Sequence, residues 1–182
     1  MNEIAKTSVA VFGSSQAQRD SPHYALAGQL GRALGTRGVE VRCGGYGGVM
    51  EAVADGVKET GGTVVGCTLA WFRETREPYG RLDTTEEASD LHARIDSLLR
   101  GARGAVVLPG GVGTFNELFW VWTLLLHDRD EGPEALVLLG KPWEDLTVYL
   151  GRHFEFTGPI LELVRIAKSA EEAAAIACGE SR

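Results

Sequence analysis

Three glycine-rich segments constrain this sequence more than any other feature. They are Gly13–Ser15, Gly44–Gly48 and Pro109–Thr114, and each follows a short apolar run and precedes a helical pattern. The chain holds 24 glycines, and glycine is informative where it clusters, because it lets the backbone approach another group closely. Repeated alternation of apolar run, glycine turn and helix predicts a parallel sheet with helices on both faces.

The order of the expected elements favours one α/β fold, a Rossmann-like three-layer arrangement with a central parallel sheet flanked by helices. Strands are expected at 9–12, 39–42, 63–67, 105–108, 135–139 and 166–167. Helices are expected at 24–34, 49–60, 89–101, 115–127, 143–154, 160–163 and 170–177. Residues 69–88 are expected to form a long irregular loop, either functional or a plain surface loop. At 182 residues, the chain fits a single domain, 1–182.

Composition excludes several classes of function. The net charge is −7, whereas nucleic-acid binding needs a basic footprint, so we expect no nucleic-acid partner. The three cysteines are scattered, which argues against a disulfide framework and against a metal site. The polar N-terminal segment 1–8 has no signal-peptide pattern, and the apolar stretch 118–126 is too short to span a membrane. These features predict a cytoplasmic protein with no membrane partner.

The glycine-rich segments predict an anion site. In an open parallel sheet, ligands bind outside the carboxyl ends of the strands, and each segment leads into a helix N-terminus, which favours an anion. Ser14, Ser15 and Thr114 add hydroxyl groups. A Walker A loop needs a lysine that all three segments lack, and no clean dinucleotide fingerprint is present. We therefore expect a monophosphate site; the competing interpretation is three tight turns without a ligand.

A cation and a carboxylate are expected beside this site. Arg94 lies in the first turns of the helix at 89–101, and Glu117 lies in the first turn of the helix that follows Pro109–Thr114. Both positions fall at the carboxyl edge of the sheet. A structural salt bridge is the simpler interpretation of such a pair. A carboxylate beside a bound phosphate is repelled by it, however, and is better suited to stabilising an oxocarbenium-like ribose or to activating water.

The chain resembles a known family in its motifs. The segment Pro109–Glu117 is similar to the PGGxGTxxE signature of the LONELY GUY (LOG) family, which are cytokinin riboside 5′-monophosphate phosphoribohydrolases long labelled lysine decarboxylases. Phe12–Ser15 resembles the first phosphate-edge loop of the family, Gly44–Met50 its GGGxxGLM segment, and Leu91–Arg94 its MHxRK segment. Thr123 stands where the family has a substrate-contacting threonine. The resemblance covers nearly the whole chain.

The resemblance implies a hydrolase that cleaves the N-glycosidic bond of an adenine-type nucleoside monophosphate, giving free base and ribose 5-phosphate. It implies Arg94 and Glu117 as the catalytic pair and no metal or organic cofactor. The expected substrate- and phosphate-binding residues are Gly13, Ser14, Ser15, Gly44, Gly45, Gly110, Gly111, Gly113, Thr114 and Thr123.

This sequence also differs from the family pattern. Asn116 replaces the first of two usual glutamates, Ile95 replaces a lysine, and Val112 replaces a common tyrosine. The second glycine segment is one residue shorter, and the 69–88 region leaves Glu74 and Glu77 both as candidates for the upstream substrate-binding glutamate. These differences bear on base specificity more than on the phosphate site. They leave open a chain that acts on AMP or another nucleotide, or that only binds one.

The helical segment 118–126 is apolar nearly all round, which predicts burial on every side. The sheet covers one face, so we expect a homodimer in which a partner subunit covers the other. Thr123 lies six residues after Glu117, about 240° around the helix. It therefore reaches a different part of the substrate, or the site lies where two subunits meet.

The sequence also bears on three other functions. A lysine decarboxylase needs a Schiff-base lysine, but the only lysines are outside the glycine-rich segments: Lys6, Lys58, Lys141 and Lys168. The remaining alternatives are a non-catalytic carrier of a nucleotide or of the molybdenum cofactor, and a nucleotide-sensing module.

The aromatic pair Trp71-Phe72 either stacks on a base, closes over the site, or packs as ordinary core.

Overall fold

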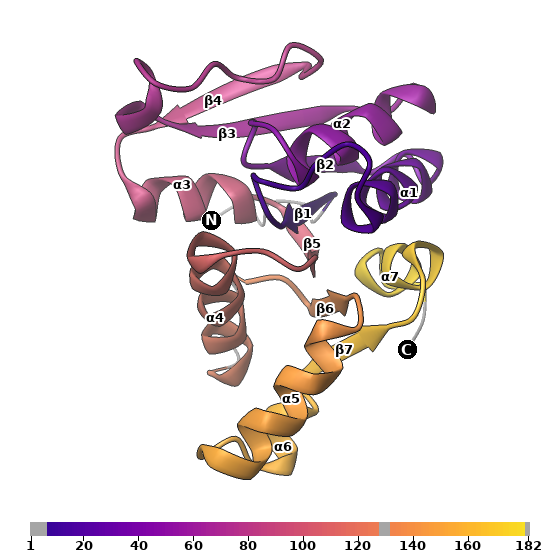
Figure 1. The fold of residues 1–182 in the computed structure, drawn as a ribbon, viewed down its shortest axis with the longest axis vertical. Helices are drawn as coiled ribbons and strands as arrows, with labels where there is room; N and C mark the ends of the chain where they lie inside the picture. The colour runs from indigo at the N-terminus through magenta and orange to yellow at the C-terminus, as the bar shows by residue number, and fades with distance from the viewer. Residues whose placement is uncertain (1–6, 128–131, 181–182) are drawn as a thin grey trace.

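The computed structural model describes residues 7–127 and 132–180, and its centre is a seven-stranded sheet whose paired strands all run parallel (Figure 1). The strands are β1 (Ser8–Phe12), β2 (Glu40–Cys43), β3 (Val64–Leu69), β4 (Thr84–Ala88), β5 (Ala102–Val107), β6 (Ala135–Leu139) and β7 (Val164–Ala167). The helices are α1 (Pro22–Thr36), α2 (Val49–Glu59), α3 (Leu91–Leu99), α4 (Val112–Leu126), α5 (Pro142–His153), α6 (Gly158–Leu161) and α7 (Ala170–Ala177). The predicted Rossmann-like α/β fold is confirmed.

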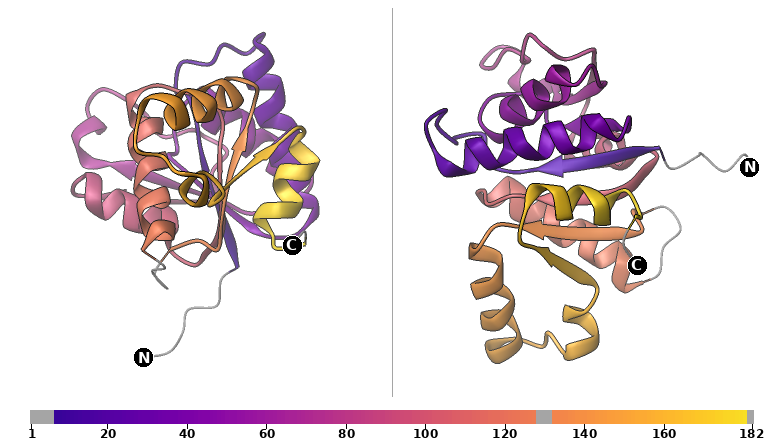
Figure 2. Two further views of the ribbon diagram at one scale, coloured as in Figure 1. Left: turned by 90° about the horizontal axis from the view of Figure 1, so that it is seen from below. Right: turned by 90° about the vertical axis from the view of Figure 1, so that its right-hand side faces the viewer.

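Helices cover both faces of the sheet and bury it from either side. The α1, α2 and α7 helices pack in one hydrophobic cluster, and α3, α4 and α5 pack in another on the opposite face. In the right-hand view of Figure 2, the arrows of β1 (indigo) and β6 (orange) point the same way. Every residue of β1 is buried, as expected for a central parallel strand whose two faces are both covered.

The sheet order places a crevice between β1 and β5. The strands run β4-β3-β2-β1-β5-β6-β7, so the order reverses at the β1–β5 pair. Phe12 pairs with Val107, and Val11 pairs with Cys43, so the ends of these strands lie level. The glycine-rich segments after β1, β2 and β5 therefore meet at one edge. In sheets of this kind, such a reversal is where ligands bind.

The prediction of an irregular loop throughout 69–88 was wrong at both ends. Residues Ala70–Phe72 form a turn of 3₁₀ helix, and Thr84–Ala88 form the edge strand β4, paired with β3. The sequence of β4 is Thr-Thr-Glu-Glu-Ala, and most of it is exposed. An edge strand with little buried surface has no apolar run or alternation to reveal it.

Several smaller findings bear on the sequence predictions. Helix α4 begins three residues earlier than expected, because Val112, Gly113 and Thr114 form its first turn. Cys43 and Cys67 are buried and Cys178 is half-buried, all as free thiols. No helix among the described residues is long and apolar enough to cross a membrane. Lys6 and most of the segment 1–8 lie outside the described residues.

Candidate functional site

A cavity of about 340 Å³ opens at the carboxyl edge of β1, β2 and β5. Its volume lies at the small end of the range of roughly 300–1,000 Å³ that small-molecule sites occupy. Nine of the predicted site residues line it: Gly13, Ser14, Ser15, Gly44, Arg94, Gly111, Gly113, Thr114 and Glu117. The structure thus brings together residues from four separate segments of the chain.

A second hollow, of about 390 Å³, lies between α1 and α7, away from this edge. Its two arginines are already paired with carboxylates: Arg32 with Glu59, and Arg37 with Glu171 and Glu180. Although it is slightly larger, it brings together none of the predicted site residues. We therefore place the candidate site in the first cavity.

The N-terminus of α4 forms one wall of the cavity. Its N-cap residue is Gly111, and no side chain caps the helix, so side chains leave the first-turn N–H groups available. A Cβ atom on Gly110 would lie 2.1 Å from Thr114 Oγ1, so packing requires glycine there. A Cβ atom on Gly111 or Gly113 would meet no atom of the described residues within 4 Å. These two glycines leave open space in front of the helix end, which is an anion-binding arrangement.

Backbone hydrogen bonds fasten the three glycine-rich segments to one another. The Ser14 N–H donates to the carbonyl of Pro109 at 3.3 Å, and the Val49 N–H donates to the carbonyl of Ser14 at 2.9 Å. Gly48 has φ of +68°, and a Cβ atom there would lie 2.4 Å from the Ser14 carbonyl oxygen. Only glycine fits this position without strain. The segment after β1 is therefore held between the other two.

Arg94 and Glu117 meet inside the cavity. The distance from Arg94 Nη1 to Glu117 Oε1 is 3.5 Å, and their side chains are 15% and 12% exposed. Arg94 Nε also donates to the carbonyl of Cys67 at 2.8 Å, which fixes the guanidinium against the end of β3. Glu117 lies in the second turn of α4 rather than the first, because the helix begins earlier than expected. The predicted convergence of the two charges is confirmed.

The environment of Glu117 raises the pKa of its carboxyl group toward neutral pH. Burial raises the pKa of Glu117 to about 7, and the nearby Arg94 cation opposes that rise only in part. A carboxyl group with a pKa near 7 holds a proton part of the time at neutral pH. General acid–base catalysis works best with such a group.

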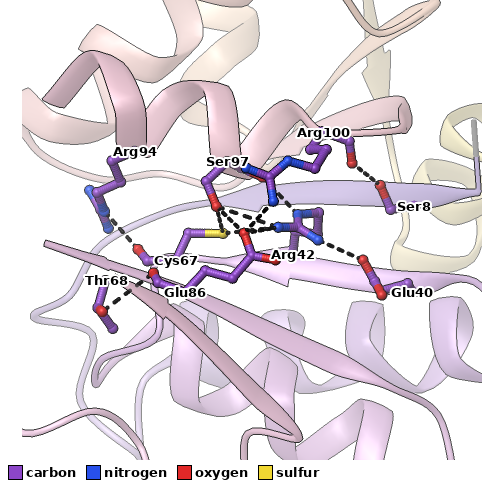
Figure 3. A network of polar contacts seen from close by, with 9 residues as sticks. All are labelled: Ser8, Glu40, Arg42, Cys67, Thr68, Glu86, Arg94, Ser97 and Arg100. Carbon is purple, nitrogen blue, oxygen red and sulfur yellow. Dashed lines mark hydrogen bonds and ion pairs between the residues drawn. The ribbon is translucent and has the colours of Figure 1, made fainter. Parts of the chain in front are cut away.

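A buried polar network holds α3, and with it Arg94, against the sheet (Figure 3). Arg42 of β2 is 4% exposed and donates through Nε to the carbonyl of Ser97 at 2.7 Å and through Nη2 to Glu86 at 2.6 Å. Ser97 donates to the same Glu86 carboxylate at 2.6 Å. Burial alone would raise the pKa of Glu86, but the hydrogen bonds from Ser97 and Arg42 hold it below its usual value. The buried cation is therefore fully paired.

Three predicted site residues do not line the cavity. Gly45 has φ of +76° and packs against Gly66, and Gly110 packs under Thr114, so both shape the wall from behind. Thr123 is exposed on α4, and its hydroxyl donates to the carbonyl of Phe119 at 2.7 Å. It points away because it lies on another face of the helix from Glu117. Thr123 does not line this cavity, and its role as a substrate contact stays a prediction.

Most of the differences from the family pattern also lie outside the cavity. Ile95 is buried in the hydrophobic cluster beneath α3, and Asn116 is exposed on α4. Glu74 and Glu77 are both exposed and neither lines the cavity. Val112, by contrast, is 88% exposed and lines it.

Sequence reasoning missed Tyr46 and Arg76 as cavity residues and named Phe72 only as one alternative. Tyr46, Phe72 and Arg76 all line the cavity; Arg76 and the neighbouring Trp71 are exposed, and Trp71 does not line it. Besides the aromatic pair Trp71-Phe72, the sequence offers the spacing of Phe72 and Arg76, four residues apart. That spacing places two side chains together only if the segment coils there, which nothing in the pattern of residues 69–88 indicates.

Comparison with known proteins identifies the family. A family model described as "Possible lysine decarboxylase" matches residues 50–177. The cytokinin riboside 5′-monophosphate phosphoribohydrolase LOG3 of Arabidopsis thaliana is 33% identical over 175 residues, which cover 90% of this chain and 78% of that protein. The chain belongs to the LOG family.

Other LOG proteins match over a smaller share of their length. The cytokinin riboside 5′-monophosphate phosphoribohydrolase of Rhodococcoides fascians is 32% identical over 127 residues, 67% of this chain and 64% of that protein. The probable enzyme LOGL1 of Oryza sativa is 32% identical over 128 residues, 68% of this chain and 57% of that protein. This chain therefore spans little more than half the length of several curated LOG relatives.

Solved structures share the fold of this LOG-family chain. The molybdenum cofactor binding protein of Rippkaea orientalis superposes with a TM-score of 0.74 at 20% identity, covering 98% of this chain and 99% of that one. The molybdenum cofactor carrier protein of Chlamydomonas reinhardtii gives a TM-score of 0.69 at 23% identity, covering 94% and 96%. At these identities the likeness concerns the fold alone.

Proposed function

We propose that this chain is a nucleoside 5′-monophosphate phosphoribohydrolase, which cleaves the bond between the base and the ribose. The observation that carries the proposal is the pairing of Glu117 with Arg94, 3.5 Å apart and largely buried, in the cavity whose wall is the uncapped N-terminus of α4. The relatives named as cytokinin riboside 5′-monophosphate phosphoribohydrolases support the same reaction on a nucleoside 5′-monophosphate.

The phosphate is assigned to the α4 end of the cavity. First-turn N–H groups without a side-chain cap attract an anion, and the open space before Gly111 and Gly113 leaves room for it. Ser14 and Ser15 also line the cavity. The chain as a whole carries a charge of −7. The N-terminus of α4 and Arg94 must therefore supply the attraction for the phosphate.

The reaction then follows from the placement of Glu117. The C1′–N9 bond breaks, and its electron pair leaves with the base, which takes up a proton from solvent water. The ribose carbon gains positive charge, which the ionised Glu117 carboxylate stabilises. A water oxygen bonds to C1′, and Glu117 accepts the proton that this water loses and returns it to solvent when the products leave. Arg94 holds the nucleotide and orients Glu117. The products are free base and ribose 5-phosphate.

Two rival functions have weaker support. Pyridoxal phosphate chemistry needs a lysine in the site, and none of the described lysines, Lys58, Lys141 and Lys168, lines the cavity. A carrier function rests on the fold shared with the Rippkaea protein, which is named a molybdenum cofactor binding protein, and with the Chlamydomonas protein, which is named a molybdenum cofactor carrier protein. An anion carrier has no use for a buried carboxylate beside the phosphate, so Glu117 favours the hydrolase.

The test is to incubate the purified protein separately with AMP, N⁶-isopentenyladenosine monophosphate and IMP, and to separate the products by chromatography. We expect free base and an equal amount of ribose 5-phosphate from at least one nucleotide. Glu117→Gln is expected to lower the rate by a factor of about 100 or more. The matched control is Glu155→Gln, an exposed carboxylate outside the cavity, which should act like wild type. Tight binding of nucleotides without release of base would instead establish a carrier.

A further inference from the structure

The part of the cavity wall that follows β2 and β3 is aromatic and carries a cation. Tyr46 follows β2, and Phe72 and Arg76 follow β3. The rings of Tyr46 and Phe72 meet edge to face, with their centroids 5.9 Å apart. The Arg76 guanidinium carbon lies 4.5 Å from the centre of the Phe72 ring, within the range of a cation–π contact.

Hydrogen bonds hold this end in place. The N–H groups of Thr75 and Arg76 donate to the carbonyl of Phe72 at 2.9 and 2.8 Å, which coils the segment and puts Arg76 beside Phe72. The Tyr46 hydroxyl accepts from the Leu69 N–H at 3.1 Å, which fixes the ring beneath them. These hydrogen bonds fix the backbone of residues 72–76 and the ring of Tyr46.

The charge of Arg76 is free for a ligand. The neighbouring arginines form ion pairs with carboxylates: Arg73 pairs with Glu87, and Arg81 pairs with Asp55. Arg76 forms no ion pair within residues 7–127 and 132–180, although it lines the cavity. A guanidinium that lies over an aromatic ring keeps its N–H edges free to donate in its own plane, and it fits a pair of adjacent acceptors.

The position of Arg76 assigns it to the base of the nucleotide. Strands β3 and β5 are three strand intervals apart in the sheet, roughly 14 Å at about 4.8 Å per interval. With the phosphate at the α4 N-terminus after β5, Arg94 and Glu117 face the ribose, and the segment after β3 faces the far edge of the base. This step rests on the proposed function.

We propose that Arg76 selects a 6-oxopurine, the base of IMP or GMP, over adenine and its N⁶-substituted forms. A 6-oxopurine presents two adjacent acceptors, O6 and N7, which an arginine binds in bidentate fashion. Adenine presents N7 beside an amino group that is a donor, so one N–H of Arg76 would face another donor. When the C1′–N9 electron pair moves into the leaving base, the charge reaches N7 and O6, where Arg76 stabilises it.

The experiment compares kcat/KM for IMP, GMP, AMP and N⁶-isopentenyladenosine monophosphate in wild type, Arg76→Met and the control Arg73→Met. We expect wild type to prefer IMP and GMP over AMP by about tenfold or more, the discrimination typical of a bidentate contact. Arg76→Met should lose that preference, with a larger fall for IMP and GMP than for AMP. Arg73→Met, an exposed arginine outside the cavity, should keep it.

Equilibrium binding of the same four nucleotides keeps the inference testable if no base is released. That result would reject the proposed hydrolase, but the ratio of dissociation constants between IMP and AMP, and its loss in Arg76→Met, would still support the selectivity. Preference for AMP or its isopentenyl form in wild type would overturn the inference. An equal fall in kcat/KM or in affinity for all four nucleotides in Arg76→Met would also overturn it. Neither result would contradict the proposed hydrolysis.

Discussion

Glu117 is buried at the expense of stability. Burial raises the pKa of Glu117 from its ordinary value of 4.5 to about 7, so between these pH values the folded chain holds a proton that the unfolded chain has lost. Stability falls with rising pH wherever the folded state binds more protons. The charged side chain therefore weakens the fold by roughly 3 kcal/mol above pH 7, on the usual conversion from pKa to free energy. A residue retained against such a penalty is typical of a functional site.

This account predicts that Glu117→Gln stabilises the protein in a pH-dependent way. Gln keeps the size of the side chain but carries no charge, so the variant should exceed wild type by up to roughly 3 kcal/mol in free energy of unfolding at pH 8. The difference should shrink as the pH falls from 7 to 4.5 and vanish below about pH 4, where Glu117 is largely protonated in both states. Urea unfolding at several pH values measures it, with Glu155→Gln as the control. A constant difference between variant and wild type across this range would contradict the assignment.

At the scale of elements, the contact between the segment after β2 and helix α3 sets the position of Arg94. A Cβ atom on Gly44 would lie 2.2 Å from Arg94 Nη2 and 2.6 Å from Met50 Sδ. Both atoms are at the ends of flexible side chains, which can move aside without unfolding the protein. The Arg94 guanidinium is then displaced from its position beside Glu117. The glycine thus keeps the guanidinium in the cavity.

We therefore predict that Gly44→Ala lowers base release by a factor of about 10 to 100, as small displacements of catalytic groups do, while the free energy of unfolding changes by less than about 1 kcal/mol. Initial-rate kinetics and urea unfolding of the same preparation measure the two effects. Gly80→Ala is the matched control, because a Cβ atom there meets none of the described atoms within 4 Å. Wild-type activity in Gly44→Ala would show that Arg94 does not need its observed position.

The sequence predicts the elements that carry strong signals and misses those whose structure depends on distant contacts. Ser21 accepts a hydrogen bond from the Tyr24 N–H at the start of α1, and Ser169 accepts one from the Glu172 N–H at the start of α7, as a local capping pattern predicts. Edge strand β4 exists because β3 offers it a hydrogen-bonding partner. Arg76 could not be placed in the cavity from sequence, because its position depends on the coil of residues 72–76.

At the scale of the whole molecule, the two charges in the site converge because of chain topology. Arg94 follows β4 and Glu117 follows β5, which lie four intervals apart in the sheet, and the helices α3 and α4 bring them together. Their placement at the carboxyl edge of the sheet follows from the order of the elements. The homodimer and the cytoplasmic location stay predictions: α4 leaves Val112 88% and Leu126 46% exposed, while its other large apolar residues are buried or half-buried within one chain.

The measurement that tests the central claim most directly is equilibrium binding of AMP and of adenosine to Glu117→Gln, in which turnover is blocked. If the α4 N-terminus holds the phosphate, AMP should bind at least about 100-fold more tightly than adenosine, the effect of two or more charge-assisted hydrogen bonds. Adding Gly113→Asp, which places a carboxylate in the open space before the helix, should abolish that difference, whereas Gly80→Asp should not. Equal affinity for AMP and adenosine would contradict the account, because it would leave the phosphate with no site in this cavity.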